Sequence, residues 1–268
     1  MDSLTDVSFV FPASIDTPER SRNLDMSIAL IMRYFDSPVS VLEAGGERRY
    51  FPKTKSGRLQ YQFVEDHQRG FNHTRYLNRL YETVTTPIMV LMDTDAIVPP
   101  NQLIETVEQI RQGTVVMGLP YDGSAYFVTA ELANAYQQTQ ELGVLENSKK
   151  YLCLMNGRIA VGIAIVVDTE KYLRAGGENE FFTDWGPEDL ERLKRMEIIY
   201  QKPVYRYPGY VFHLWHPRNN SQYHDPQQEI AFKQEYLKIC GMTQKELISH
   251  VESWPWKEKF KAFKKTIA

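Results

Sequence analysis

The stretch "PIMVLMDTDAIVPP", residues 87 to 100, runs five apolar side chains directly into two carboxylates. The apolar run from Ile88 to Met92 has the length of a strand that is buried on both faces, as in the middle of a parallel sheet. Asp93 and Asp95 then fall at the carboxyl end of this strand, where such sheets hold their ligands. The alternative is that one aspartate caps the helix that starts near Pro100. We therefore expect a parallel sheet with acidic side chains at its ligand-binding edge.

Strand and helix patterns alternate on both sides of this segment. The expected strands are 7–12, 38–44, 59–66 and 114–120, and the expected helices follow Pro18 and cover 72–84 and 101–112. After Pro18, the apolar residues are spaced by three or four, which is typical of one helix face: Leu24, Ile28, Ile31 and Phe35. This alternation predicts an α/β fold with a doubly wound, mostly parallel sheet. The second half is less regular, with a helix expected at 130–142, a strand at 158–167, and a helix from Pro187.

Composition excludes several classes of protein. The 268 residues are 43% hydrophobic and 24% charged, which is ordinary for a soluble globular protein. A net charge of −3 gives no general attraction to nucleic acid, so we expect no nucleic-acid partner. The longest apolar run, 159–167, is far shorter than the roughly 18 residues that span a bilayer, and the N-terminus lacks a signal-peptide pattern, so we expect a cytoplasmic protein. Cys153 and Cys240 lie far apart, which predicts free thiols.

Two later segments could complete a site with the two aspartates. Residues 175–196 contain Trp185 and open a helix after Pro187 with Glu188 and Asp189 in its first turn. Carboxylates in a first turn also have a purely structural explanation, because they interact favourably with the helix dipole. Trp185 beside a flexible, glycine-containing loop instead favours sugar binding, because sugar rings present apolar faces to aromatic side chains.

The other segment, residues 207–220, places His213 and His216 at the end of an expected strand. Side chains three positions apart on a strand point to opposite faces. We therefore expect one of the two histidines to be a metal ligand and the other to pack or to form hydrogen bonds.

These segments, in this order, resemble the inverting GT-A glycosyltransferases, in particular the galactosyltransferase and chondroitin-polymerase type of glycosyltransferase families 2 and 7. The resemblance covers about residues 7 to 220. It is carried by "PASIDTPERSRNL" (12–24), "FNHTRYLNRLYE" (71–82), "PIMVLMDTDAIVP" (87–99), "AGGENEFFTDWGPEDLE" (175–191) and "FHLWHPR" (212–218). It implies a GT-A fold with a D-x-D motif and a C-terminal helical tail.

The resemblance implies a divalent ion, Mn²⁺ or Mg²⁺, held by Asp95 and His216. Asp93 would contact the sugar or ribose of the donor and is a further candidate ligand, and His213 would assist His216. Asp189 would be the general base. Other positions match residues that contact the nucleotide, the donor sugar or the acceptor: Pro12, Phe71 and His73 for the nucleotide, and Trp185, Gly186 and Glu188 for the sugars.

The implied activity is metal-dependent, inverting transfer of a sugar of the Gal, GalNAc or Glc type. The donor would be a UDP-sugar, and the acceptor would be a hydroxyl of a saccharide or a lipid-linked saccharide, as in polysaccharide biosynthesis. Two departures from the family pattern bear on this implication. Pro187 stands where a second glycine is usual, and Ala13 and Ser14 stand where an arginine is expected. The proline concerns the conformation of the acceptor loop, and the missing arginine concerns the contacts with the diphosphate.

We expect one catalytic domain, residues 1–225, with a nucleotide-sugar half (1–120) and an acceptor half (121–225), followed by a C-terminal helical extension (226–268). The tail 254–268 holds five lysines and one glutamate, a net charge of +4, among aromatic residues. It could lie on the anionic inner face of the cytoplasmic membrane, or dock its aromatics onto the catalytic domain.

Two other functions are compatible with parts of this pattern. A non-catalytic binding protein of the GT-A type would share the fold, although the complete set of carboxylates and histidines argues against it. A sugar-nucleotide pyrophosphorylase would need a glycine-rich phosphate loop after the first strand, and residues 11–22 contain no glycine.

Overall fold

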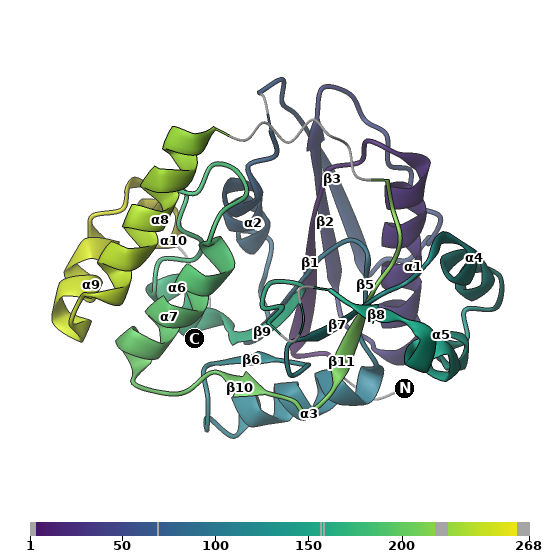
Figure 1. Cartoon of the computed structure of the whole chain (residues 1–268). Helices are drawn as coiled ribbons and strands as arrows, with labels where there is room; N and C mark the ends of the chain where they lie inside the picture. Colours follow the sequence, from purple (N-terminus) through teal and green to yellow (C-terminus); the bar gives the residue numbers. More distant parts are fainter. Residues whose placement is uncertain (1–3, 69, 156, 158, 218–224, 262–268) are drawn as a thin grey trace.

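The computed structural model describes residues 4–68, 70–155, 157, 159–217 and 225–261. In the view of Figure 1, a large sheet stands between helices, with α2, α6 and α7 on its left, α1 on its right and α3 below it. The C-terminal helices form the outermost layer on the left. The α/β architecture with a sheet flanked by helices is therefore as the sequence predicted.

The described residues form a seven-stranded central sheet with the order β10-β6-β9-β4-β1-β2-β3. Its strands are β1 (Val7–Ala13), β2 (Val39–Gly45), β3 (Leu59–Glu65), β4 (Ile88–Met92), β6 (Met117–Leu119), β9 (Ala164–Asp168) and β10 (Tyr205–Arg206). The pairs β1–β4, β1–β2, β2–β3 and β6–β10 are parallel, whereas β9 runs antiparallel to both β4 and β6. The sheet is therefore mostly parallel, as predicted. The direction of β9 could not be read from its sequence, because Ala164 to Val167 are all buried and show no alternation.

The helices cover the sheet with the faces that their apolar spacing predicts. In α1, the residues Leu24, Ile28 and Ile31 are fully buried, and the helix starts where the Thr17 side chain accepts a hydrogen bond from the Arg20 amide. The helices are α1 (Pro18–Tyr34), α2 (His73–Tyr81), α3 (Pro100–Arg111), α4 (Ala130–Thr139), α5 (Leu142–Ser148), α6 (Thr169–Arg174), α7 (Glu188–Tyr200), α8 (Pro226–Cys240), α9 (Gln244–Glu252) and α10 (Glu258–Lys261), with 3₁₀ turns at Lys149–Tyr151 and Pro255–Lys257.

Two predicted elements differ from the structure. The helix expected over 130–142 is two helices, because Gln140 adopts a left-handed conformation (φ 52°) and its amide closes α4 on the Tyr136 carbonyl. The strand expected over 158–167 begins only at Ala164. Residue 158, where the strand was expected to begin, lies outside the described part of the chain. The backbone of Ile163 does not belong to the strand and forms hydrogen bonds with the Tyr121 hydroxyl and the Asp93 amide.

A smaller sheet, with the order β5-β11-β7-β8, brings distant parts of the chain together. Its strands are β5 (Ala96–Ile97), β7 (Ser124–Phe127), β8 (Cys153–Leu154) and β11 (Tyr210–His213). In the antiparallel pair β5–β11, His213 lies opposite Ala96, the residue that follows Asp95. This pairing places the histidine segment against the carboxylate segment.

The C-terminal helices α8 and α9 pack against α7. Ile239, Leu247 and Val251 form a buried cluster with Trp254, and Ile198 of α7 packs against it. Trp254 and Phe260 are only 6% and 4% exposed, which favours the docking alternative for this part of the tail. Phe263 and the rest of residues 262–268 lie outside the described residues.

Two further expectations concern the chain as a whole. Among the described helices, none is both long and apolar enough to cross a membrane. Cys153 and Cys240 are free thiols, as predicted.

We expect Gly176→Ala to lower the free energy of unfolding more than Gly113→Ala. Both glycines have positive φ (98° and 68°), so alanine strains either backbone by about 1–2 kcal/mol. Only at Gly176 would the new Cβ also meet the Trp254 ring, at 2.7 Å, which adds about 1–3 kcal/mol. Urea denaturation of the two variants measures the difference. Equal losses would mean that the C-terminal segment is not docked on Gly176.

Candidate active site

The turn after β4 is held rigidly in place. The Asp93 amide donates to the Ile163 carbonyl (3.0 Å), and the Ala96 amide donates back to the Asp93 carbonyl (3.3 Å). From α1, the buried Ser27 hydroxyl donates to the carbonyls of Thr94 (3.2 Å) and Ala96 (2.9 Å). The apolar strand therefore ends in a turn whose backbone is fixed on two sides, and this fixes where the two carboxylates point.

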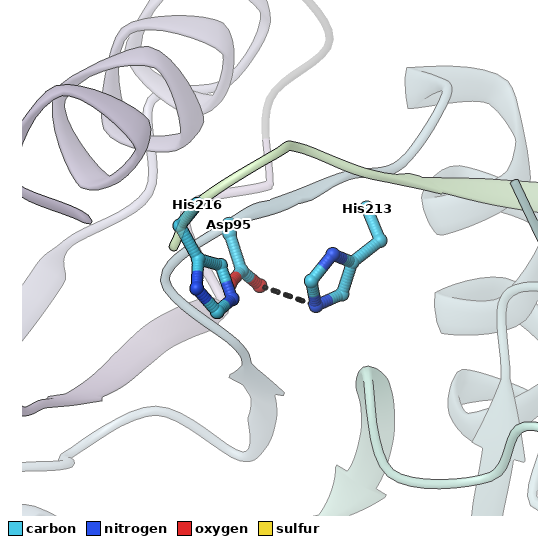
Figure 2. Close-up of side chains that lie close together, drawn as sticks. All are labelled: Asp95, His213 and His216. Carbon is cyan, nitrogen blue, oxygen red and sulfur yellow. Dashed lines mark ion pairs between the residues drawn. The ribbon is translucent and has the colours of Figure 1, made fainter. Parts of the chain in front are cut away.

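Asp95 lies between two histidines (Figure 2). Its Oδ2 is 3.0 Å from Nε2 of His216, and its Oδ1 is 3.5 Å from Nε2 of His213. Both histidines face the carboxylate, so the expectation that they point to opposite faces is wrong. The reason is that β11 ends at His213, so the alternation of a strand does not extend to His216. The Leu214 amide bonds to the Asp95 carbonyl (2.9 Å), which extends the β5–β11 pairing by one residue and keeps the histidine segment beside Asp95.

The donor set of this cluster fits a divalent transition metal. One carboxylate oxygen and two imidazole nitrogens lie within 4.8 Å of one another, and imidazole ligands suit Mn²⁺ better than Mg²⁺, which prefers oxygen. His216 Nδ1 lies 2.9 Å from the Pro217 carbonyl and must be the donor there, since a carbonyl only accepts. In the neutral ring, the Nε2 lone pair then faces Asp95, an arrangement that requires either a proton or a metal ion between the two groups.

The pKa values of the two aspartates shift in opposite directions. Burial acts to raise the pKa of Asp95, but the adjacent His213 and His216 outweigh it and lower that pKa. Burial raises the pKa of Asp93 well above its usual range, and the charges of Asp95 and Asp189 raise it further. Asp95 is thus kept anionic, whereas Asp93 favours the protonated form, which can donate a hydrogen bond.

Asp93 faces a small cavity that also contains two of the predicted nucleotide-contacting residues, Pro12 and His73. The cavity is lined by Pro12, His73, Leu77, Leu91, Met92, Asp93, Gly162 and Arg192. Burial, and next the charge of Arg192, lower the pKa of His73, so its imidazole is neutral. Phe71, the third predicted contact, packs against the Tyr76 ring with the centroids 5.0 Å apart and is not part of this lining.

The residues predicted to bind the sugars lie at the start of α7. Trp185 is 78% exposed, so its ring is free to cover an apolar sugar face. The Glu188 carboxyl is buried and accepts a hydrogen bond from the Gly186 amide (2.8 Å). Burial and the neighbouring Asp189 raise the pKa of Glu188 to about 8. Asp189 is paired with a guanidinium instead, since its Oδ1 is 2.7 Å from Nη1 of Arg192.

Three residues around Asp189 were not predicted. Arg192 follows Asp189 by three positions on a helix, so the two share a face, a spacing that could have identified the pair. Gly162 interrupts an apolar strand pattern, which often marks a close approach of another group. A Cβ at Gly162 would lie 1.9 Å from Oδ2 of Asp189. Glu178 lies in the quoted segment 175–191 but carries no sequence signal that distinguishes it from other acidic residues.

Comparison with known proteins supports the fold. No family model and no curated protein matches the sequence. A crystal structure of GalNAc-T7 with UDP, GalNAc and Mn²⁺ is similar with a TM-score of 0.55 and 11% identity, over 97% of this chain and 54% of that chain. Glucosyl-3-phosphoglycerate synthase from Mycobacterium tuberculosis, in complex with Mn²⁺, UDP and phosphoglyceric acid, gives a TM-score of 0.47 and 14% identity over 88% of this chain and 78% of that chain.

The likeness to GalNAc-T7 shows that this chain has the GT-A fold, which the sequence motifs predicted. This chain spans about half the length of GalNAc-T7.

We expect His216→Ala to weaken Mn²⁺ binding about tenfold or more, because it removes one of the imidazoles that face Asp95. Calorimetric titration with Mn²⁺ in the presence of UDP measures this. His67→Ala is the control, since His67 is exposed and bonded to Glu65 (2.8 Å) in a different loop. Similar affinities for the two variants would exclude His216 as a ligand.

Glu188 should make stability depend on pH. Its folded-state pKa is raised to about 8, so the contribution of its protonated form is complete below the unfolded value and is lost as the pH rises through about 8. Glu188→Gln cannot ionise and should therefore gain stability relative to wild type as the pH rises from 6 to about 8, with little further gain up to pH 9. Thermal melting across this range tests it, and a difference that does not change with pH would contradict the raised pKa.

Proposed function

We propose that this chain is a metal-dependent, inverting glycosyltransferase that moves a sugar from a UDP-sugar to a hydroxyl of a saccharide or lipid-linked saccharide. The observation that carries the proposal is the cluster of Asp95, His213 and His216 at the carboxyl end of β4. In an α/β sheet this edge is where nucleotides bind, and a cation-binding cluster there suits a ligand with a diphosphate.

On the donor side, Asp95 and His216, with His213 beside them, would hold Mn²⁺, or less well Mg²⁺. When bound, the ion would act as a Lewis acid that neutralises the charge of the diphosphate leaving group. Asp93, Pro12 and His73 line the adjoining cavity and would contact the nucleotide or its ribose. The protonated form of Asp93 would donate to a hydroxyl or phosphate oxygen.

Arg20 supports the donor side as well. It lies in the first turn of α1, is ion-paired with Asp16 (3.1 Å), and its charge acts on both Asp93 and Asp95. The family pattern expects an arginine where Ala13 and Ser14 stand. A guanidinium from the following helix can supply the same positive charge to a diphosphate.

On the acceptor side, Asp189 would take the proton from the attacking hydroxyl. Its side chain is 31% exposed, which leaves room for an acceptor to approach. Attack on the anomeric carbon from the face opposite the diphosphate inverts the configuration, and only one general base is needed for it. Glu188, kept protonated by burial, and Gly186 and Trp185 would position the sugars.

The proposed donor sugars are of the Gal, GalNAc or Glc type, and the proposed role is in polysaccharide biosynthesis in the cytoplasm. GalNAc in the GalNAc-T7 complex supports testing UDP-GalNAc first. A peripheral contact with the inner face of the membrane would have to depend mainly on residues beyond 261, because Trp254 and Phe260 are buried.

The test is a panel of UDP-sugars assayed for Mn²⁺-dependent hydrolysis, followed by transfer to saccharide acceptors. We expect Asp189→Asn to reduce transfer by roughly two to four orders of magnitude, which is the usual contribution of a positioned general base. Affinity for UDP and Mn²⁺ should stay near the wild-type value, because the metal cluster is made by other residues.

Two outcomes would contradict this proposal. Full wild-type turnover in excess EDTA would exclude a metal-dependent reaction. Tight binding of UDP-sugars without any turnover would instead indicate a non-catalytic binding protein.

A further inference from the structure

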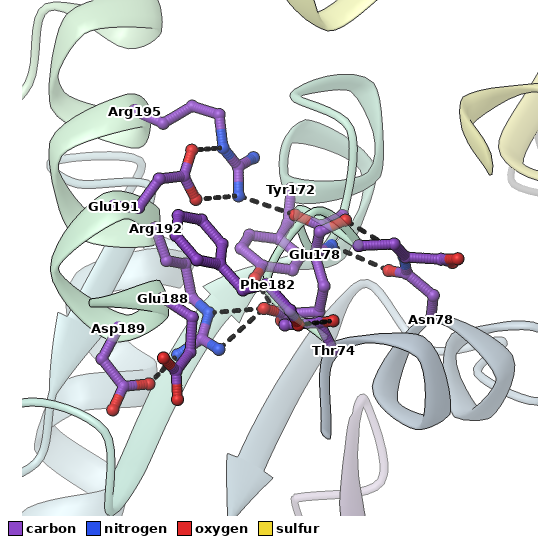
Figure 3. A network of polar contacts seen from close by, with 12 residues as sticks. Thr74, Asn78, Tyr172, Glu178, Phe182, Glu188, Asp189, Glu191, Arg192 and Arg195 are labelled. Carbon is purple, nitrogen blue, oxygen red and sulfur yellow. Dashed lines mark hydrogen bonds and ion pairs between the residues drawn. The ribbon is translucent and has the colours of Figure 1, made fainter. Parts of the chain in front are cut away.

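A buried ionic network lies behind Asp189 (Figure 3). Its centre is Arg192, whose side chain is 1% exposed. Nε and Nη2 of Arg192 donate to Oε2 of Glu178 at 2.9 and 2.7 Å, and Nη1 donates to Oδ1 of Asp189 at 2.7 Å. One planar guanidinium therefore joins a fully buried carboxylate to a partly exposed one.

Hydrogen bonds fix both the side chain and the backbone of Glu178. Its Oε1 accepts hydrogen bonds from the hydroxyls of Tyr81 and Tyr172. Its backbone is fixed by Asn78, whose side-chain oxygen accepts from the Glu178 amide (2.7 Å) and whose side-chain nitrogen donates to the Glu178 carbonyl (3.0 Å). With both oxygens of its carboxylate bonded, Glu178 holds Arg192 in a single orientation.

Asp189 is restrained on its other side by Gly162. Its Oδ2 lies 1.9 Å from the position that a Cβ of residue 162 would occupy, so the carboxylate rests directly on the glycine backbone. Oδ1 is held by Arg192. The carboxylate thus has one hydrogen-bonded side and one side in van der Waals contact, and its 31% exposed remainder faces outward.

We propose that Arg192 is a positioning residue for Asp189: through Glu178 it holds the carboxylate in the orientation that accepts the proton of the acceptor hydroxyl. This inference rests on the proposed function, in which Asp189 is the general base. It goes further by assigning the geometry of that base to a residue outside the metal cluster. Displacement of a reacting group by about 1 Å can lower a rate by roughly 100-fold.

The same helix offers a matched control. Arg195 is also fully buried, is paired with Glu191 (2.8 Å) and donates to the Gly177 carbonyl (2.8 Å). It lies over the Trp254 ring and not against Asp189. Arg195→Lys should therefore cost stability much as Arg192→Lys does, without an effect on the orientation of Asp189.

The experiment compares Arg192→Lys and Arg195→Lys in melting temperature, UDP and Mn²⁺ affinity, KM and kcat. Lysine keeps the charge but lacks the rigid fork that bridges two carboxylates. We expect Arg192→Lys to lower kcat about 10- to 100-fold without a change in Mn²⁺ affinity, because Arg192 is not part of the metal cluster, and Arg195→Lys to leave kcat near wild type.

A double variant tests whether Arg192 acts through Asp189. In an Asp189→Asn background, Arg192→Lys should cause no further loss of kcat, because the group that it positions no longer accepts a proton. If Arg192→Lys does not fold, Gly162→Ala provides a second test. Its new Cβ must displace the Asp189 carboxylate, so this single variant should show the same loss of kcat.

The outcomes separate this inference from the proposed function. Wild-type protein that turns over no UDP-sugar overturns the proposed function and, with it, the role of Arg192. An active wild type in which Arg192→Lys and Arg195→Lys have equal kcat, or in which the Arg192 and Asp189 effects multiply, overturns the positioning role alone.

Discussion

Removing a carboxylate from water costs several kcal/mol unless a proton, a cation or hydrogen-bond donors compensate for the lost hydration. This constraint shapes the whole region between β4 and α7. Buried acidic side chains are concentrated there: Asp95, Glu178, Glu188 and Glu191. Asp95 is compensated by two imidazoles, Glu178 and Glu191 by buried arginines, and Glu188 by a proton that it keeps up to a pH of about 8. The positions of the histidines and arginines follow from this requirement.

The kind of compensation separates structural carboxylates from those available for chemistry. Glu178 and Glu191 are saturated by partners within the protein, so they fix neighbouring segments but have nothing left for a ligand. Asp95 is compensated mainly by His213 and His216, which themselves can bind a metal. Asp189 shares its guanidinium with Glu178 and retains exposed surface. These two carboxylates therefore retain capacity for a further partner, while the network behind Asp189 stays fixed.

Local signals explain what the sequence could predict. The apolar run of β4 and the spacing of α1 were sufficient, because a strand and a helix each impose their own periodicity on buried positions. The joint approach of His213 and His216 to Asp95 was not predictable, since it depends on where β11 stops and on its pairing with β5, which lies more than a hundred residues earlier in the chain. The Arg192–Glu178 pair joins two different segments of the chain. The spacing of apolar residues within a helix or strand does not predict such a pair.

The contacts around Pro187, including those of the C-terminal extension, explain how the chain accommodates proline where the family pattern has a second glycine. Proline is tolerated there because Pro187 precedes the first turn of α7, and the preceding amide, that of Gly186, is bound by the Glu188 carboxyl. On its other side, Gly186 lies so close to Phe232 of α8 that a Cβ would approach that ring within 2.8 Å, and Phe232 also packs against Phe182. The loop that carries Trp185 is therefore held by contacts with both α7 and α8. Because segments that share buried contacts open together, unfolding of α8 would also release this loop, so in the proposed function the extension supports the acceptor side of the site.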